Sequence, residues 1–94
     1  MVELLLKQKG FVQEYKFHPI RKWRLDWAHV SRKIAIEIEG GVWTGGRHTS
    51  GAGFTKDMEK ANSLTVLGWK LLRYTPKQFK DGLPLADLEE MKVL

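Results

Sequence analysis

The chain has 94 residues, 43% of them hydrophobic, which suffices for one domain over residues 1–94 but not for two separate cores. It has no cysteine, which excludes disulfides and thiolate zinc sites and suits a reducing cytoplasm. Sixteen Lys and Arg residues against eleven Asp and Glu give a net charge of +5, which favours a polyanionic partner such as DNA.

The first part of the chain predicts a short helix followed by a β meander. The helix is expected over residues 3–9 and ends at Gly10. Its three leucines are too short an apolar run for a secretory or membrane segment, so we expect a cytoplasmic protein. From residue 11 to residue 39, β-branched and aromatic residues are frequent, and Pro19 and Ser31 interrupt them, which indicates two or three strands.

Basic residues gather around one acid, Asp26, in the predicted meander. They are Lys16, Arg21, Lys22, Arg24, Arg32 and Lys33. One interpretation is a solvated strand edge protected by cations against aggregation. The functional interpretation is phosphate contact beside a metal site, with Arg21, Lys22 and Arg24 as nucleic-acid-binding residues.

Residues 33–39 alternate strictly between two kinds of side chain. Ile34, Ile36 and Ile38 are predicted to line one face of a strand, and the opposite face carries Ala35, Glu37 and Glu39. The two glutamates are either the solvated face of an amphipathic strand or part of a site. The loop GGVWTGGRHTSGAG follows, with six glycines in fourteen residues, and its Arg47 and His48 are further candidates for phosphate contact.

The second half of the chain predicts a helix over residues 54–67, a strand over 69–74 and a final helix over 84–93. Phe54, Met58, Ala61 and Thr65 are expected on the core face of the first helix, with Asp57, Lys60 and Leu64 opposite, and Gly68 ends it. Thr75 is a predicted N-cap, and Pro76 begins a short helix. Without that short helix, the order is α-β-β-β-α-β-α, which predicts a layered α/β or α+β domain.

Carboxylates on adjoining strands suggest metal chemistry. Asp26 lies one short connection before the strand that carries Glu37 and Glu39, so the three acids can converge if the strand register allows it. Converging carboxylates repel one another unless a cation lies between them. A hard divalent ion such as Mg²⁺ or Mn²⁺ fits oxygen ligands and can promote phosphodiester hydrolysis.

The tryptophans allow two roles. Trp27 and Trp69 are expected in the core, whereas Trp23 and Trp43 lie next to basic residues or in the glycine-rich loop. An exposed tryptophan in such a place can stack on an unpaired base or cover a sheet edge.

Taken together, four segments resemble the PD-(D/E)XK nuclease superfamily. They are RLDWA at residues 24–28, IEIEGG at 36–41, DMEKAN at 57–62 and GWKLLR at 68–73. Within the superfamily, the chain is similar to small phage-type endonucleases related to VRR-NUC domains, to Holliday junction resolvases and to very-short-patch-repair endonucleases. The resemblance covers residues 14–75 and implies a restriction-endonuclease-like domain with a mixed central sheet.

The resemblance also implies roles for individual residues. Asp26 and Glu37 match the metal-binding acids of the family, and the backbone carbonyl of Ile38 would be a further ligand. Glu39 stands where the family usually has a lysine, so Lys60 of the following helix is the candidate for the missing positive charge. In a weaker correspondence, Glu3 matches an additional acidic ligand of resolvase-like members, and Glu14 competes with it for that role.

Two functions are therefore expected as alternatives. The first is a Mg²⁺- or Mn²⁺-dependent DNA endonuclease, a Holliday junction resolvase in one form, that works as a homodimer. The second is a catalytically silent nucleic-acid-binding or specificity module with the same fold. Retention of Asp26, Glu37 and Lys60 favours the nuclease, because a binding module has no use for acids that repel one another.

Overall fold

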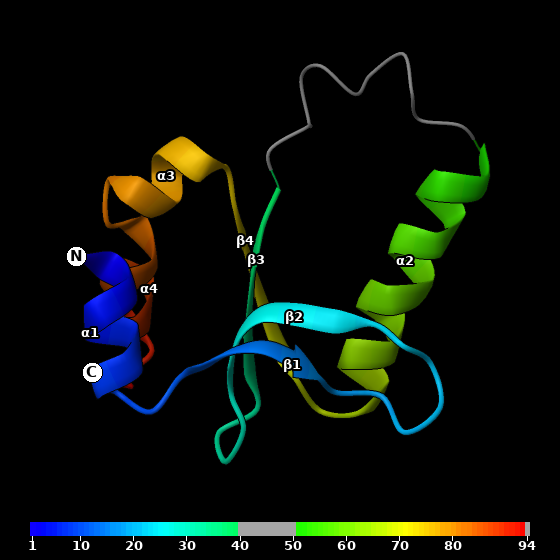
Figure 1. The fold of residues 1–94 in the computed structure, drawn as a ribbon, viewed down its shortest axis with the longest axis horizontal. Helices are drawn as coiled ribbons and strands as arrows, with labels where there is room; N and C mark the ends of the chain where they lie inside the picture. Colours follow the sequence, from blue (N-terminus) through cyan, green and yellow to red (C-terminus); the bar gives the residue numbers. More distant parts are fainter. Residues whose placement is uncertain (40–50, 94) are drawn as a thin grey trace.

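The computed structural model describes residues 1–39 and 51–93, in which helices cover both faces of a four-stranded sheet (Figure 1). The elements in chain order are α1 (Val2–Gln8), β1 (Val12–Lys16), β2 (Arg24–His29), β3 (Ile34–Ile38), α2 (Gly51–Val66), β4 (Lys70–Tyr74), α3 (Pro76–Lys80) and α4 (Leu83–Glu90). Within these residues, no helix is long and apolar enough to cross a membrane.

The sheet is mixed. Its strand order is β1-β2-β3-β4, in which β1, β2 and β3 are antiparallel neighbours and β4 runs parallel to β3. The chain crosses over from β3 to β4 by way of α2, which lies on the face of the sheet opposite to α1, α3 and α4 (Figure 1). The predicted α+β class is confirmed, with two short helices after β4 where the predicted order has one. The restriction-endonuclease-like form of this class stays a prediction.

Two apolar clusters pack on the two faces of the sheet. The larger cluster, beneath α1, α3 and α4, consists of Val2, Leu6, Phe11, Trp27, Ile34, Ile36, Tyr74, Phe79 and Leu88. The smaller cluster, beneath α2, consists of Leu25, Ala28, Ala35 and Leu64, with Trp69 packed against it. The core positions expected for Trp27 and Trp69 are thus confirmed.

The alternation predicted for β3 is confirmed, but its second face is not a solvated one. Ile34 and Ile36 belong to the larger cluster, and Ile38 packs against it. On the other face Ala35 is fully buried and the Glu37 side chain is only 15% exposed, because α2 covers both. A carboxylate under a helix needs a partner, since burial without one is costly.

The predicted core face of α2 is wrong. Met58 is 48% exposed and Thr65 is also exposed, whereas Leu64 is 1% exposed and packs against the sheet. The side chain of Phe54 lies outside the described residues. The physical reason is that the buried stripe of α2 is apolar only near its C-terminal end, and one and two turns earlier it carries Lys60 and Asp57. These polar residues meet polar partners on the sheet, so hydrophobic periodicity alone does not reveal the stripe.

The helix boundaries follow predicted signals. Gly68, at φ +88°, ends α2, because a glycine adopts this left-handed conformation without a steric penalty. Thr75 caps α3 as predicted: its hydroxyl accepts from the backbone N–H of Gln78 at 3.1 Å, and the Gln78 side chain accepts from the Thr75 backbone N–H at 3.0 Å. This capping box starts α3 directly after β4.

Candidate active site

The antiparallel ladder between β2 and β3 ends at a pair of carboxylates. Trp27 pairs with Ile36, which places Asp26 opposite Glu37 at the next position. There, the Asp26 backbone N–H donates to Glu37 Oε2 at 3.0 Å, and the Ile38 N–H donates to Asp26 Oδ2 at 2.7 Å. Each acid therefore binds the backbone of the facing strand in place of a ladder carbonyl. The two acids lie together, as the short connection between their strands suggests.

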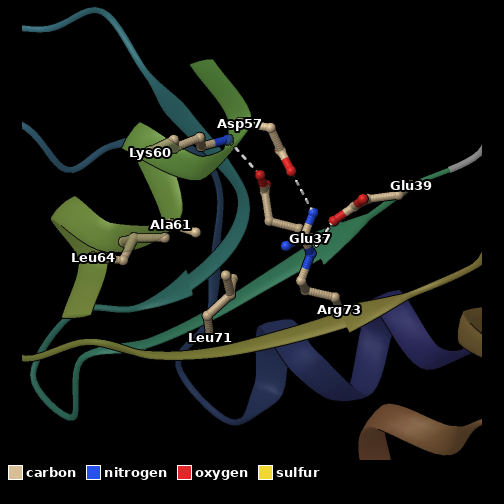
Figure 2. A pocket seen from close by; sticks show the side chains of 8 residues that line it. All are labelled: Glu37, Glu39, Asp57, Lys60, Ala61, Leu64, Leu71 and Arg73. Carbon is tan, nitrogen blue, oxygen red and sulfur yellow. Dashed lines mark hydrogen bonds and ion pairs between the residues drawn. The ribbon is translucent and has the colours of Figure 1, made fainter. Parts of the chain in front are cut away.

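Lys60 of α2 completes this group. Its ammonium donates to Glu37 Oε1 and to the backbone carbonyl of Arg24 at 2.7 Å. The side chains of Lys60 and Glu37 are only 18% and 15% exposed, so solvent screens their ion pair less than it screens a surface pair. Lys60 thus lies beside the acids of the sheet, and Figure 2 shows it pointing from α2 towards Glu37.

A second ion-pair group lies next to the first and centres on Arg73 of β4, which the sequence analysis did not single out. The Arg73 guanidinium donates to Glu39, directly after β3, and to Asp57 on α2, the latter at 2.9 Å. The hydrogen bond to Glu39 is the main cause that raises the pKa of Arg73, and the hydrogen bond to Asp57 adds to it. The place of Arg73 in the site can be predicted only if β4 is known to run parallel to β3, because that register pairs Arg73 with Glu37.

Arg73 also bears on Glu39, the residue that the resemblance described above matches to a lysine. The partner of Glu39 is the guanidinium of Arg73 from the neighbouring strand. A cation therefore lies near this point of the site even though residue 39 is an acid. A lysine at position 39 would instead face Arg73 with a like charge, which is unfavourable.

The two groups enclose a small pocket between the sheet and α2 (Figure 2). Its lining residues are Glu37, Glu39, Asp57, Lys60, Ala61, Leu64, Leu71 and Arg73. Its volume of about 10 Å³ is close to the smallest that holds one water molecule. Three carboxylates and two cations line it, so the charges of the side chains around the pocket nearly balance.

The remaining acidic candidates have ion-pair partners outside this group. Glu3 lies on α1, across the sheet from α2, and forms an ion pair with the N-terminal amine at 3.5 Å. Glu14 lies on β1, where its exposed side chain pairs with Arg24 at 3.5 Å. The register of β1 and β2 places Glu14 opposite Asp26, but within the described residues no hydrogen bond joins Glu3 or Glu14 to Asp26 or Glu37.

The basic candidates lie on and beside the connection between β1 and β2. Arg21 forms an ion pair with Glu59 of α2 at 3.5 Å, and Arg24 is the partner of Glu14. Lys22 is exposed and forms no ion pair within residues 1–39 and 51–93. The other two candidates, Arg47 and His48, lie outside the described residues, as does Trp43.

The donor groups can be tested against the predicted Mg²⁺ ion. No three acidic or histidine side chains of the described residues come together as a metal-binding group. Mg²⁺, however, usually binds proteins through one or two carboxylates, with waters and substrate phosphate completing its shell. Asp26 Oδ1 has no hydrogen-bond partner among the described residues, whereas both oxygens of Glu37 have one. Asp26 and Glu37 thus fit the ion in type and number, provided that Lys60 gives up Glu37 Oε1.

Comparison with family models finds no match for this chain, and neither does comparison with curated proteins or with solved structures.

Proposed function

We propose that the chain is a divalent-metal-dependent DNA endonuclease of the PD-(D/E)XK kind, with a restriction-endonuclease-like fold, and that it hydrolyses phosphodiester bonds as a homodimer. The observation that carries this proposal is the meeting of Asp26, Glu37 and Lys60, which come from β2, β3 and α2. Two carboxylates can hold a divalent ion and an ammonium can stabilise developing negative charge, and metal-assisted phosphodiester hydrolysis can use both. A Holliday junction is the structured substrate that we propose to test first.

The order of elements supports the proposal. A helix, three antiparallel strands, a second helix and a strand parallel to the third form one continuous unit from α1 to β4. This order is the one that the sequence pattern predicts, and a mixed central sheet is what the resemblance implies. It places the acids where β2 and β3 cease to pair, so their side chains are held by backbone N–H groups and not by flexible contacts.

Each residue has a definite task in this proposal. Asp26 and Glu37 would hold Mg²⁺ or Mn²⁺, with the carbonyl of Ile38 as the further ligand that the resemblance implies. The bound ion would lower the pKa of a water molecule and neutralise charge on the phosphate. Lys60 holds a positive charge beside Glu37, where it can orient the attacking water or stabilise negative charge that develops on the phosphoryl oxygens.

A second function is favoured by one observation. Glu37 and Lys60 form an ion pair, and Glu39 and Asp57 share Arg73, so cations of the chain itself balance the acids that line the pocket. The argument that repulsive acids have no use in a binding module therefore loses force. A nucleic-acid-binding or specificity module without catalysis is the alternative, in which Lys60 and Arg73 have a structural role.

Cleavage assays separate the two functions. Plasmid, single-stranded and four-way-junction DNA are incubated with the protein in Mg²⁺, in Mn²⁺ or in EDTA. We expect cleavage only with a divalent ion, and its loss in Asp26→Asn and Glu37→Gln, because these changes keep the side-chain shape but remove the negative charge. Glu90→Gln on α4, an exposed acid far from the pocket, is the matched control.

Two outcomes would contradict the nuclease. One is cleavage that persists in EDTA or in both variants, and the other is DNA binding by the wild type with no cleavage under any metal condition. The second outcome would establish the binding module. Circular dichroism of each variant verifies that a lost activity is not a lost fold.

A further inference from the structure

The connection between β1 and β2, residues 17–23, is held in shape by its own side chains. His18 Nδ1 accepts two hydrogen bonds from the backbone, one from the N–H of Ile20 at 3.1 Å and one from the N–H of Arg21 at 2.9 Å. These two bonds fix the backbone on both sides of residue 20. The connection is therefore a turn with an internal cap and not a freely moving loop.

An aromatic stack closes the base of this turn. The rings of Phe17 and Trp23 are nearly parallel, at 12°, with centroids 6.1 Å apart, and the Arg21 guanidinium lies 4.0 Å from the centroid of the Trp23 ring. Trp23 thus already has ring and cation partners inside the protein. This arrangement disfavours stacking of a nucleic-acid base on Trp23. Trp23 instead stabilises the turn through its contacts with Phe17 and Arg21.

Ile20 projects from the turn. Its side chain is 84% exposed, and its backbone N–H donates to His18 Nδ1. One exposed apolar residue is ordinary and needs no explanation by itself. Val66 at the end of α2, for example, is 83% exposed, but its chain neighbours Thr65 and Leu67 carry no charge.

The surroundings distinguish Ile20 from such a residue. Arg21 and Lys22 follow it directly in the chain, and Lys16 and Arg24 lie at the two ends of the strands that the turn joins. All four cations are exposed to solvent. An apolar tip surrounded by cations is complementary to duplex DNA, in which an apolar stack of bases lies between two rows of phosphates.

The turn also lies next to the candidate active site. Lys60 donates to the carbonyl of Arg24 at 2.7 Å, and Arg21 pairs with Glu59 of the same helix. Figure 1 shows the connection between β1 and β2 running beside α2. DNA that contacts the turn would therefore be held close to Glu37 and Lys60.

We propose that Ile20 is an apolar wedge that inserts between neighbouring base pairs of duplex DNA, while the cations around it bind the phosphates on either side. This inference rests on the proposed action on DNA and adds how the protein binds the duplex. Proteins that insert an isoleucine or a similar side chain partly unstack one base step and bend the duplex there. A turn that is fixed before binding suits this use, since no ordering of the loop opposes insertion.

The experiment measures unstacking without cleavage. Short duplexes carry the fluorescent base 2-aminopurine beside a flexible TA step, and EDTA is present throughout. Fluorescence anisotropy gives the affinity, and the rise in 2-aminopurine emission at saturation gives the unstacking. The proteins are the wild type, Ile20→Ser, Ile20→Leu and, as the matched control for an exposed aliphatic residue, Val66→Ser.

We expect the wild type and Ile20→Leu to raise the emission and Ile20→Ser to lose the rise. Affinity should fall about tenfold in Ile20→Ser, because burying an isoleucine side chain changes an equilibrium constant by about this factor. Val66→Ser should match the wild type in both measurements. Lys22→Ala should keep the rise at saturation and change the slope of log K against log salt by about 0.9.

Other outcomes overturn the wedge. They are an emission rise in Ile20→Ser equal to that of the wild type, an equal loss in Val66→Ser, or no rise in the wild type at saturation. The proposed function is judged separately. Binding and unstacking without cleavage in Mg²⁺ would overturn the endonuclease and leave the wedge standing, whereas no binding to any DNA would overturn both.

Discussion

Lys60 is the residue on which the nuclease and the binding module differ most. Its ammonium has two acceptors, one on β3 and one at the start of β2, so it is fixed before any substrate arrives. A charge that is fixed in advance stabilises a transition state without reorganisation. In a binding module the same lysine would merely neutralise Glu37.

We predict that Lys60→Ala lowers the single-turnover cleavage rate by a factor on the order of 10² to 10³, the usual loss for one preorganised electrostatic group. DNA affinity should change little, because one phosphate contact among several contributes modestly. Lys56→Ala, an exposed lysine one turn earlier on α2, is the control. If Lys60→Ala cleaves at the wild-type rate, Lys60 does not supply the positive charge, and Arg73 becomes the candidate for that role.

Arg73 joins β3 to α2 through Glu39 and Asp57, and its side chain is 41% exposed. Solvent reduces the contribution of such pairs, so we predict that Arg73→Gln lowers the free energy of unfolding by about 1 kcal/mol. For a domain of this size, the melting temperature should fall by about 4–8 °C. The difference should shrink at high salt. Arg32→Gln, which removes an exposed arginine with no ion pair among the described residues, should show no such salt-dependent loss. A loss of stability that does not depend on salt would show that Arg73 stabilises the fold by packing and not by charge.

At the scale of the elements, a side-chain hydrogen bond links β4 to α4 in addition to their apolar packing. The Tyr74 hydroxyl donates to Asp87 Oδ2 at 2.6 Å. Burial raises the pKa of Tyr74 above its ordinary value of 10.0, and the hydrogen bond to Asp87 raises it further. The neutral phenol is thus favoured in the folded state over the unfolded one.

The sign of the pH dependence follows from this shift. A group with a raised pKa in the folded state stabilises the fold fully below its unfolded pKa of 10.0 and loses that contribution as the pH rises above it. We predict that the free energy of unfolding falls above about pH 10, and that Tyr74→Phe falls less steeply there. At neutral pH the variant should be less stable by about 2 kcal/mol, the contribution of a hydrogen bond to a charged group. Parallel alkaline slopes would exclude Tyr74 as the cause.

The element predictions also show what the sequence can specify. The strict alternation of β3, the N-cap at Thr75 and the glycine stop at Gly68 are local signals, and the structure confirms each of them. The face of α2 is not a local property. It depends on polar partners that the sheet supplies from distant parts of the chain. Hydrophobic periodicity therefore predicts the wrong face of α2 for Lys60 and Asp57.

The candidate site divides in the same way. Asp26 and Glu37 could be paired from the sequence because one short connection joins their strands. Arg73 could not be added, because its place beside Glu37 arises from the parallel crossover between β3 and β4. The hydrogen bonds from backbone N–H groups to the two carboxylates could not be predicted either, since they exist only where the ladder between β2 and β3 ends.

At the scale of the whole molecule, we predict a twofold symmetric dimer. A domain of 94 residues buries a modest share of its surface and gains stability from association, and two active sites are needed to cut both strands of a duplex or junction. Light scattering over a concentration series, with and without a four-way junction, measures the mass. A monomer under both conditions, with nicked plasmid as the only product, would contradict the dimer.

At the end of the β2–β3 ladder, two backbone amide protons bond directly to the carboxylates of the candidate site. The N–H groups of Asp26 and Ile38 donate to the carboxylates of Glu37 and Asp26, and these hydrogen bonds are expected to slow their exchange with solvent. Any cation or ligand that draws either carboxylate away leaves an amide without its acceptor. Hydrogen–deuterium exchange at these two positions therefore shows whether a ligand displaces a carboxylate from the backbone, whereas an ion bound only through Asp26 Oδ1 and Glu37 Oε1 leaves both amides bonded.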